Sequence, residues 1–192
     1  MKYLIYIFLP FFLVSCDIFE TRDTENPDQS RSNYQPASEP GIVIQNLINA
    51  FADKNVDNYR KSLETDFSNK IFSFIPSSAA LSRFQNIWPT WNLDSETQYF
   101  NDMKTIVPDE LPVTLSLSLD PESFSILGDS LKYTSEYFIS VPQSETSPLN
   151  YQGNVEFSMV RDSRQVWVIY FWKDNGIGDN PSWSDLKGDH VN

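Results

Sequence analysis

The sequence predicts one α+β domain in which helices come first and long antiparallel strands follow. A change of apolar period along the chain predicts this order, and the chain length predicts a single domain. Apolar residues recur at helical spacing before Pro108, whereas they alternate with polar residues beyond Pro112. About 150 residues remain once a leader and a polar N-terminal segment are set aside, and a chain of that length usually forms a single domain. Helices and strands segregated in this way are typical of α+β proteins.

The first helix is expected to begin near Ser38, because this serine can act as a cap and is followed by Glu39 and Pro40. Apolar residues then recur at spacings of three and four and form one broad face: Val43, Ile44, Leu47, Ile48 and Phe51. A turn at Lys54-Asn55 ends this helix.

Two further helices complete the helical half of the chain. Asp57 is expected to cap a short second helix that directs Tyr59 and Leu63 toward the core. Asp94 is expected to cap a third helix, which runs to about Ile106. Both caps would satisfy backbone N–H groups that have no partner inside the helix.

The third helix has an acidic first turn and an apolar inner face. Glu96 lies in that first turn, where the helix dipole favours negative charge, and Phe100 and Met103 are expected on the inner face. Before this helix, an apolar run at residues 71–75 predicts a short strand that ends at Pro76.

Beyond Pro112 the alternation predicts five strands joined by turns. Turn residues occur at Gly128-Asp129 and at residues 162–164. The strands are expected at residues 113–119, 124–127, 131–141, 151–161 and 166–173. The last strand is apolar on both faces, as expected where a sheet is covered on both sides.

The first 16 residues are typical of a bacterial lipoprotein signal. A single lysine gives a basic start, and the apolar run that follows is shorter than the about 20 residues that a membrane-spanning helix needs. Leu13, Val14, Ser15 and Cys16 then stand in the order of a lipobox. We therefore expect a signal peptide at residues 1–15 and acylation of Cys16, with chains such as palmitate.

Acylation would make the lipid membrane a partner of this protein. Each buried methylene contributes about 0.8 kcal/mol, so that two or three acyl chains anchor stably where one does not. The expected location is the bacterial cell envelope, and the sequence does not distinguish its inner from its outer membrane. An ordinary secretory signal, with Cys16 discarded or left as a free thiol, is the alternative.

Composition restricts the partners that the chain can have. It carries 14 Lys plus Arg against 26 Asp plus Glu, a net charge of −12, which repels phosphate backbones and makes nucleic acid an unfavourable partner. Hydrophobic residues make up 40% and aromatic residues 15%, enough for a core. Residues 16–37 are polar without any period, and we expect a lipidated flexible linker there. Cys16 is the only cysteine, so no disulfide can form within the chain.

The element order resembles the NTF2-like superfamily, in which a strongly curved sheet wraps around helices and forms a cone. The segments Asn49-Ala50-Phe51, Asn55-Val56-Asp57-Asn58-Tyr59 and Asp66-Phe67 resemble the opening two helices of that superfamily. The resemblance implies three N-terminal helices packed in a strongly curved antiparallel sheet, here over residues 38–192. Because the superfamily contains enzymes and binding modules alike, it implies architecture and no single activity.

A narrower resemblance involves residues near both ends of the chain. The lipobox, residues 19–23 and the tail elements Trp172-Lys173-Asp174 and 182–188 are similar to a group of uncharacterised bacterial lipoproteins. This resemblance implies location and architecture only.

The sequence names no catalytic residue. The sole histidine, His190, lies in the tail, which excludes Ser-His-Asp and Cys-His schemes and a histidine-rich metal site. Glu136 and Glu156 fall on the polar phase of their strands, and Asp66 fits a cap or turn. Residues 174–180 fit a glycine-rich turn better than a calcium loop. We expect no cofactor and no metal.

Aromatic residues give the one candidate ligand site. Tyr133 and Tyr137 share the inward phase of a central strand, and Trp88, Trp91 and Trp167 are expected to approach the same concavity. In the alternative interpretation, these rings simply fill the cone.

These observations favour a membrane-anchored, non-enzymatic domain of the cell envelope that binds a protein partner or a small apolar ligand. One alternative is an isomerase, dehydratase or hydrolase that works by carboxylate and tyrosine chemistry. Another is a structural subunit of an envelope assembly, which would show a large exposed apolar patch on its sheet.

Overall fold

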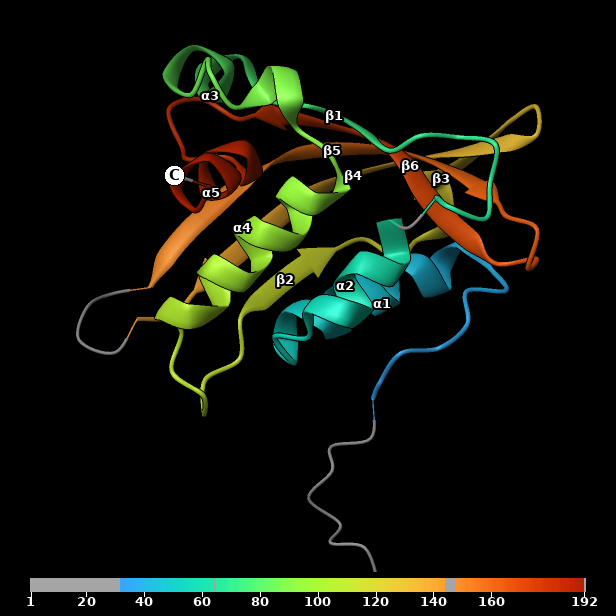
Figure 1. The fold of residues 1–192 in the computed structure, drawn as a ribbon, viewed down its shortest axis with the longest axis horizontal. Coiled ribbons are helices and arrows are strands. Elements are labelled where there is room, and N and C mark those ends of the chain that lie inside the picture. The colour runs from blue at the N-terminus through green and yellow to red at the C-terminus, as the bar shows by residue number, and fades with distance from the viewer. Residues whose placement is uncertain (1–31, 64, 144–147, 192) are drawn as a thin grey trace, which may run out of the picture. The chain divides into compact units, whose positions relative to one another are not determined.

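The computed structural model describes residues 32–63, 65–143 and 148–191, and the chain from Ser32 onward belongs to one compact unit (Figure 1). The predicted signal peptide, Cys16 and most of the predicted linker lie outside the described residues. Within the described part of the chain, no helix is long and apolar enough to cross a membrane.

The described elements follow the predicted order of helices and then strands. The helices are α1 (Pro40–Ala52), α2 (Val56–Leu63), α3 (Ser78–Arg83), α4 (Leu93–Ile106) and α5 (Trp183–Asp189), with short 3-10 turns at Trp88–Thr90 and Pro121–Ser123. The strands are β1 (Ser73–Ile75), β2 (Thr114–Leu117), β3 (Phe124–Leu127), β4 (Ser130–Val141), β5 (Leu149–Arg161) and β6 (Trp167–Gly176). The predicted α+β class is therefore confirmed.

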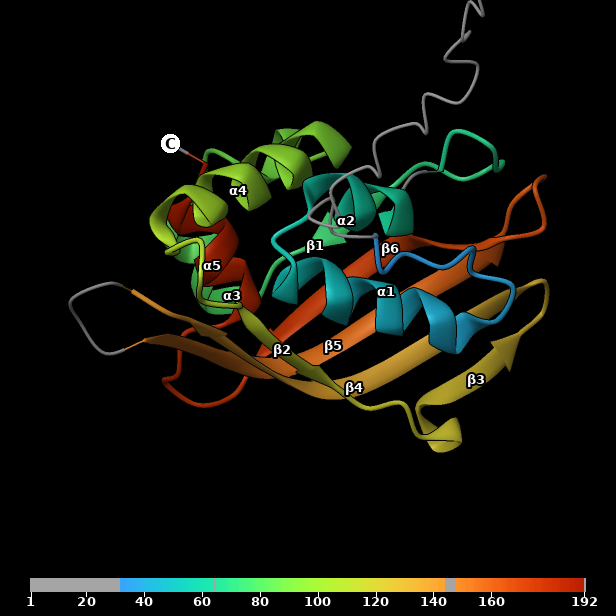
Figure 2. The same cartoon turned by 90° about the horizontal axis from the view of Figure 1, so that it is seen from below.

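One curved sheet carries the helices on one of its faces (Figure 2). Its strand order is β1-β6-β5-β4-β2, and β3 pairs with β4 beside β2. Every pairing is antiparallel except that of β1 with β6, which is parallel. Helices α1, α2 and α5 contact the concave side of this sheet, so the core lies between them and the long strands β4, β5 and β6.

The helix caps differ from the predicted ones. Asn55, and not Asp57, caps α2, because its Oδ1 accepts the N–H of residue 58 at 3.0 Å. Asn92, and not Asp94, caps α4 through a reciprocal capping box with Ser95. The serine predicted to cap the first helix makes no such bond, since α1 starts after Glu39 without a side-chain cap. In each of the three helices, the residue at the N-cap position lies one or two residues away from the predicted one.

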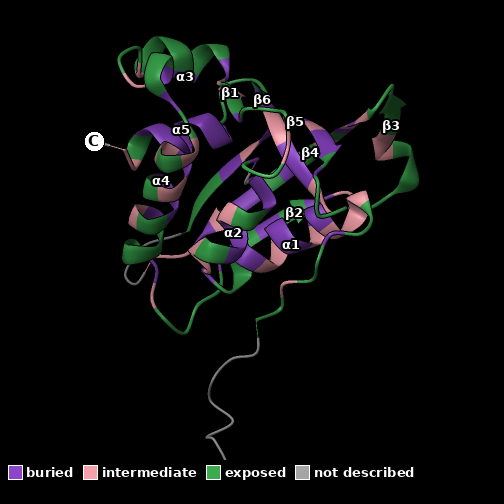
Figure 3. Cartoon of the chain, turned by 45° about the vertical axis from the view of Figure 1, so that its right-hand side comes forward, coloured by how far each residue is buried: buried purple, intermediate pink, exposed green. Residues whose placement is uncertain are grey.

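Two helices escaped the sequence prediction. Both α3 and α5 are shorter than eight residues, so neither contains enough turns for a helical period to be visible. The sequence predicts no element after the last strand, yet α5 forms there and six of its seven residues are buried (Figure 3).

The double-sided apolar pattern of the last strand has two structural causes. A bulge at Ser158/Met159 shifts the register of β5 against β6, so that the inward phase of β6 changes from Trp172 to Ile169. Val168, on the outward phase, is also buried. Lys70, from the segment before β1, lies over the ring of Tyr170, which is also a residue of β6. This segment therefore covers that part of the outer face of the sheet.

Aromatic rings fill the centre of the domain. The rings of Phe51, Tyr59 and Phe100 pack on one another beside Tyr99, and Phe74, Trp172 and Trp183 continue the contacts toward the sheet. Edge-to-face geometries dominate these contacts, which is the arrangement that ring quadrupoles favour. The concave face of the sheet is thus packed with side chains from α1, α2, α4 and α5.

Gly153 makes room for the ring of Tyr137 on the neighbouring strand. A Cβ at this position would lie 2.5 Å from the Asn175 carbonyl oxygen and 2.5 Å from Tyr137 Oη. We predict that Gly153→Ala lowers the free energy of unfolding by about 1–3 kcal/mol, the usual cost of overpacking a core. Gly41→Ala is the matched control, because nothing lies within 4 Å of the added methyl. Equal stability of the two variants in urea denaturation would contradict the packing described here.

Candidate functional site

The C-terminal helix α5 places two large side chains in the centre of the cone. Ser182 and Asp185 form a capping box, in which Asp185 Oδ2 accepts the Ser182 N–H at 2.8 Å. This cap fixes the start of the helix. Trp183 and Lys187 lie four residues apart and therefore project from the same side of α5 into the core, where both are fully buried.

Lys187 forms a buried ion pair with Glu96 of α4. Its Nζ donates to Glu96 Oε1, and neither side chain reaches solvent. The ammonium also lies 3.5 Å from the ring centroid of Trp172 and 3.8 Å from that of Phe74. These ring faces replace part of the hydration that the charge loses, by cation–π attraction. Burial lowers the pKa of Lys187 to about 8, against the opposing effect of Glu96.

Two further donors converge on the same carboxylate, and a third side chain reaches it through Tyr59. Trp91 Nε1 donates to Glu96 Oε1 at 2.7 Å, and Tyr59 Oη donates to Oε2 at 2.6 Å. Tyr99 donates to Tyr59 Oη at 3.2 Å, and it accepts the indole N–H of Trp183 at 3.1 Å. Glu96 is therefore the end point of a hydrogen-bond chain that starts on α5.

A second buried carboxylate joins α5 to the sheet. Asp174 of β6 accepts from Tyr137 Oη at 2.7 Å, and its other oxygen accepts the Ser184 N–H at 2.7 Å. The Ser184 hydroxyl donates to the same oxygen, and Tyr137 Oη accepts the Trp183 N–H at 2.7 Å. Two of the first backbone N–H groups of α5 are thus satisfied by side chains of the sheet.

The core tyrosines are held in their neutral form. Burial raises the pKa of Tyr59, Tyr99 and Tyr137 well above the ordinary value, and the nearby Glu96 or Asp174 carboxylates raise it further. These phenols can donate hydrogen bonds, but they cannot lose a proton near neutral pH. As a group, the buried polar side chains hold α5 in place and are shielded from solvent.

The five predicted ligand-binding residues do not form one site. Tyr137 contacts α5, whereas Tyr133 lies nearer the start of β4. The Tyr133 hydroxyl donates to the Ser118 carbonyl at 2.7 Å, and burial raises its pKa to about 12. Trp88 and Trp91 pack on each other beside Phe74. The ring of Trp167 lies elsewhere, under the guanidinium of Arg161. Their role in ligand binding stays a prediction.

The structure places Glu136, Glu156 and His190 where the sequence predicts them. Glu136 is exposed on the outer face, and Glu156, on the same phase, pairs with Lys132 at 2.7 Å. His190 directly follows α5, and burial lowers its pKa. Among the described residues, no cluster of three or more His, Cys, Asp or Glu side chains could hold a metal ion.

The sequence analysis missed the residues that close the cone. Glu96 was assigned to the helix dipole, and Lys187 was assigned no role. One available signal was the Ser182-x-x-Asp185 spacing, which is similar to a capping box. Another was the four-residue spacing from Trp183 to Lys187, which places both on one helix face.

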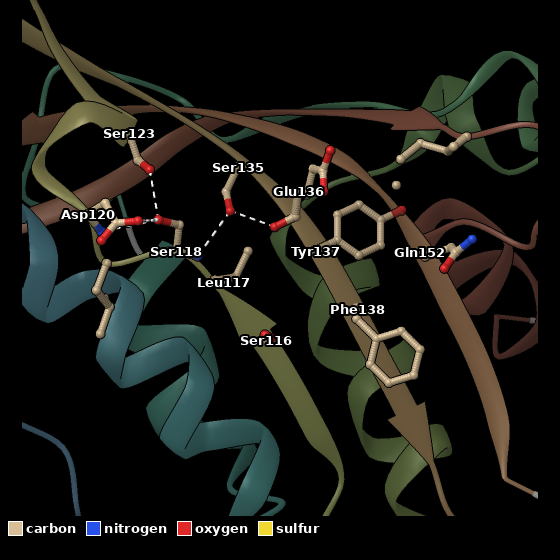
Figure 4. A pocket seen from close by; sticks show the side chains of 13 residues that line it. Ser116, Leu117, Ser118, Asp120, Ser123, Ser135, Glu136, Tyr137, Phe138 and Gln152 are labelled. Atoms are coloured by element: carbon tan, nitrogen blue, oxygen red, sulfur yellow. Dashed lines mark hydrogen bonds between the residues drawn. The ribbon is translucent and has the colours of Figure 1, made fainter.

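A groove of about 870 Å³ lies outside the cone, where β2 and its following segment meet β4 and β5 (Figure 4). Serine hydroxyls hold its wall together. Ser123 Oγ donates to Ser118 Oγ at 3.1 Å, and Ser135 Oγ accepts the Ser118 N–H at 3.0 Å. The outward-facing Glu136 and Gln152 also line the groove, and neither side chain makes a hydrogen bond or ion pair with another described residue.

Comparisons with known proteins identify the fold. No family model and no curated protein match the sequence. Similar solved structures include a candidate aromatic-ring hydroxylase from Novosphingobium aromaticivorans, with a TM-score of 0.55 and 10% identity over 76% of this chain and 91% of that chain. A conserved protein from Planctomyces limnophilus gives a TM-score of 0.53 and 12% identity over 70% and 91% of the two chains.

A third similar structure carries the name of the superfamily. It is a candidate dehydratase of the NTF2-like family from Streptomyces avermitilis, with a TM-score of 0.52 and 8% identity over 71% of this chain and 93% of that chain. The predicted NTF2-like fold is therefore confirmed. At such identities the likeness concerns the fold alone, and the activities in these names belong to those proteins.

The Glu96–Lys187 pair gives a stability prediction. We expect Lys187→Met to lower the free energy of unfolding by about 3–5 kcal/mol, because it leaves a buried carboxylate without its counter-charge. Adding Glu96→Gln removes that charge and should recover about 2 kcal/mol or more. Exposed Lys104→Met is the matched control and should change stability by less than about 0.5 kcal/mol. The idea fails if the double variant is less stable than the single one in urea denaturation.

The raised tyrosine pKa values give a pH prediction. Unfolded tyrosine ionises near pH 10, whereas folded Tyr59 stays protonated, so its contribution to stability is present below about pH 10 and decreases above it. Lys187 acts in the opposite direction above about pH 8, because its pKa is lowered in the folded state. Stability is measured against pH for the wild type and for Tyr59→Phe. Both proteins retain Lys187, so the difference between their two profiles reports the contribution of Tyr59. Parallel stability profiles of the two proteins from about pH 9 to 12 would contradict this prediction.

Proposed function

We propose that this chain is a lipid-anchored protein of the bacterial cell envelope whose NTF2-like domain binds a protein partner and does not catalyse a reaction. The position of α5 supports the proposal that the domain is not an enzyme. Trp183 and Lys187 occupy the centre of the cone, where a small apolar ligand or a substrate would otherwise lie.

The buried carboxylates support this proposal, because their acceptor positions are already in use. Glu96 accepts hydrogen bonds from Lys187, Trp91 and Tyr59. Asp174 accepts from Tyr137 and twice from Ser184. A general base must reach the proton that it abstracts, and a carboxylate enclosed by such donors has no room for a substrate.

The anchor part of the proposal rests on the sequence. Leu13, Val14, Ser15 and Cys16 follow the lipobox order after an apolar run of export-signal length. The net charge of −12 would by itself disfavour contact with anionic lipid, so that covalent acyl chains are the simplest way to hold this chain at a membrane.

A protein partner fits the outer groove better than a small apolar molecule does. The groove is lined mainly by polar side chains, including Glu136 and Gln152, whose hydrogen-bonding groups are available to a partner. Phe138 lies on the same outward phase with 40% of its surface exposed, and it can supply apolar contact. Free polar groups around an exposed aromatic ring are typical of protein interfaces.

The test is mass spectrometry of proteins cross-linked to the full chain in its own membrane. The groove variant combines Glu136→Lys with Phe138→Ser. Its matched control combines Glu110→Lys with Leu111→Ser, because Leu111 is 41% exposed on a different loop. We expect one partner to be captured by the wild type and the control, and at least tenfold less of it by the groove variant, which corresponds to about 1.4 kcal/mol. Equal capture by both variants would contradict the groove assignment.

A Cys16→Ala variant tests the anchor in the same cells. We expect it to leave the membrane fraction, because it lacks the acylated cysteine. Wild-type protein that takes up no labelled fatty acid, together with a variant that remains in the membrane fraction, would show that the lipoprotein assignment is wrong.

A further inference from the structure

Three segments far apart in the sequence meet at one end of the sheet. Residues 67–70, the β3–β4 turn at 128–130 and residues 160–167 around the β5–β6 turn together line an open pocket of about 780 Å³. We call this region, with β3, the hairpin end; it lies at the right-hand side of Figures 1 and 2. The β4–β5 pairing runs from Ser130↔Val160 here to Val141↔Leu149 at the opposite end.

Large apolar side chains are exposed at the hairpin end. Ile126 of β3 is 85% exposed, Leu127 is 63% exposed and Phe67 is 46% exposed. Single exposed apolar residues are ordinary on protein surfaces, but Ile126 and Leu127 are consecutive in β3 and therefore expose apolar side chains on both of its faces.

Exposed cations are present at the hairpin end, although the chain as a whole is acidic. Lys70, Arg161 and Arg164 are exposed there, within a chain of net charge −12. Arg164 pairs with the buried Asp162 at 2.7 Å, and Asp129 is an exposed acid in the same region. Each of the three cations also lies over an aromatic ring: Lys70 over Tyr170, Arg161 over Trp167 and Arg164 over Phe67.

The N-terminal part of the domain is attached to the same end. Trp167 donates its backbone N–H to the Ala37 carbonyl at 2.8 Å, and Arg161 donates to the Ser38 carbonyl at 3.2 Å. Cys16 precedes Ser32 by 16 residues, and a chain of that length spans at most about 55 Å. An acylated Cys16 would therefore keep the domain close enough for this end to touch the bilayer.

We propose that the hairpin end is a second membrane contact, which rests on the surface of an anionic phospholipid bilayer. This inference depends on the acyl anchor proposed above. Ile126 and Leu127 enter the headgroup region, and Lys70 and Arg161 face the lipid phosphates, as apolar and basic side chains do at membrane surfaces. Glu136 follows Ser130, at the hairpin end, by six residues of β4. The groove around Glu136 is then held about 20 Å from the lipid, where a partner can reach it.

The experiment uses the full acylated chain with one added cysteine that carries a fluorescent label. Because Cys16 is the only native cysteine, Ile126→Cys and Leu149→Cys each give a single labelling site. Leu149 is the matched control, since it is exposed and lies at the other end of the same strands. The proteins are placed in vesicles of phosphatidylethanolamine and phosphatidylglycerol that contain brominated lipid, which quenches a label inside the bilayer surface.

We expect roughly threefold or stronger quenching at Ile126 than at Leu149, because only the hairpin end enters the headgroup region. Lys70→Glu should reduce this difference, and so should added salt. Equal quenching at the two positions in a vesicle-bound protein would overturn the inference while leaving the anchor intact. Shielding of Ile126 from a water-soluble quencher without lipid quenching would show that a second copy covers this end, and would also overturn it. A chain that does not float with vesicles would instead contradict the proposed anchor.

Discussion

A lysine ammonium sits in the middle of this domain without any contact with water, and its attraction to Glu96 is the interaction on which the remaining structure depends. An unpaired charge in such surroundings costs several kcal/mol, so α4 and α5 must remain together for the fold to be stable. The aromatic faces of Trp172 and Phe74 complete the surroundings of the charge. The C-terminal helix is therefore an integral part of the core and closes the cone from within.

This closure separates the two kinds of polar residue in the molecule. Those inside, such as Glu96, Asp174 and Tyr137, bond to one another and give their hydrogen-bonding capacity to the fold. Those outside, such as Glu136 in the groove and Lys70 at the hairpin end, remain available to other molecules. A domain arranged in this way is suited to binding by its surface. The two surfaces proposed for binding are the groove that contains Glu136 and the hairpin end that contains Lys70 and Arg161.

The sequence predicted the strands well because their physical signal is local. Tyr133 and Tyr137 were placed on the inward phase of β4, and alternation alone fixes that phase when one face is buried. The sequence did not predict that α5 belongs to the core, because the partner of Lys187 lies 91 residues away in the chain. A glutamate in a first helical turn fits the helix dipole equally well whether it is exposed or buried, so Glu96 could be recognised as a core residue only from tertiary structure.

If α5 belongs to the core, it does not open on its own, and native-state hydrogen exchange can measure whether it does. The Trp183 and Ser184 amides donate to Tyr137 Oη and Asp174, so their exchange reports the closure of the cone. The structure predicts that both amides exchange only by global unfolding, with the same free energy as the central amides of β4 and β5. Exchange of these two amides at a much lower free energy would show that α5 opens separately, and would contradict a core closed by this helix.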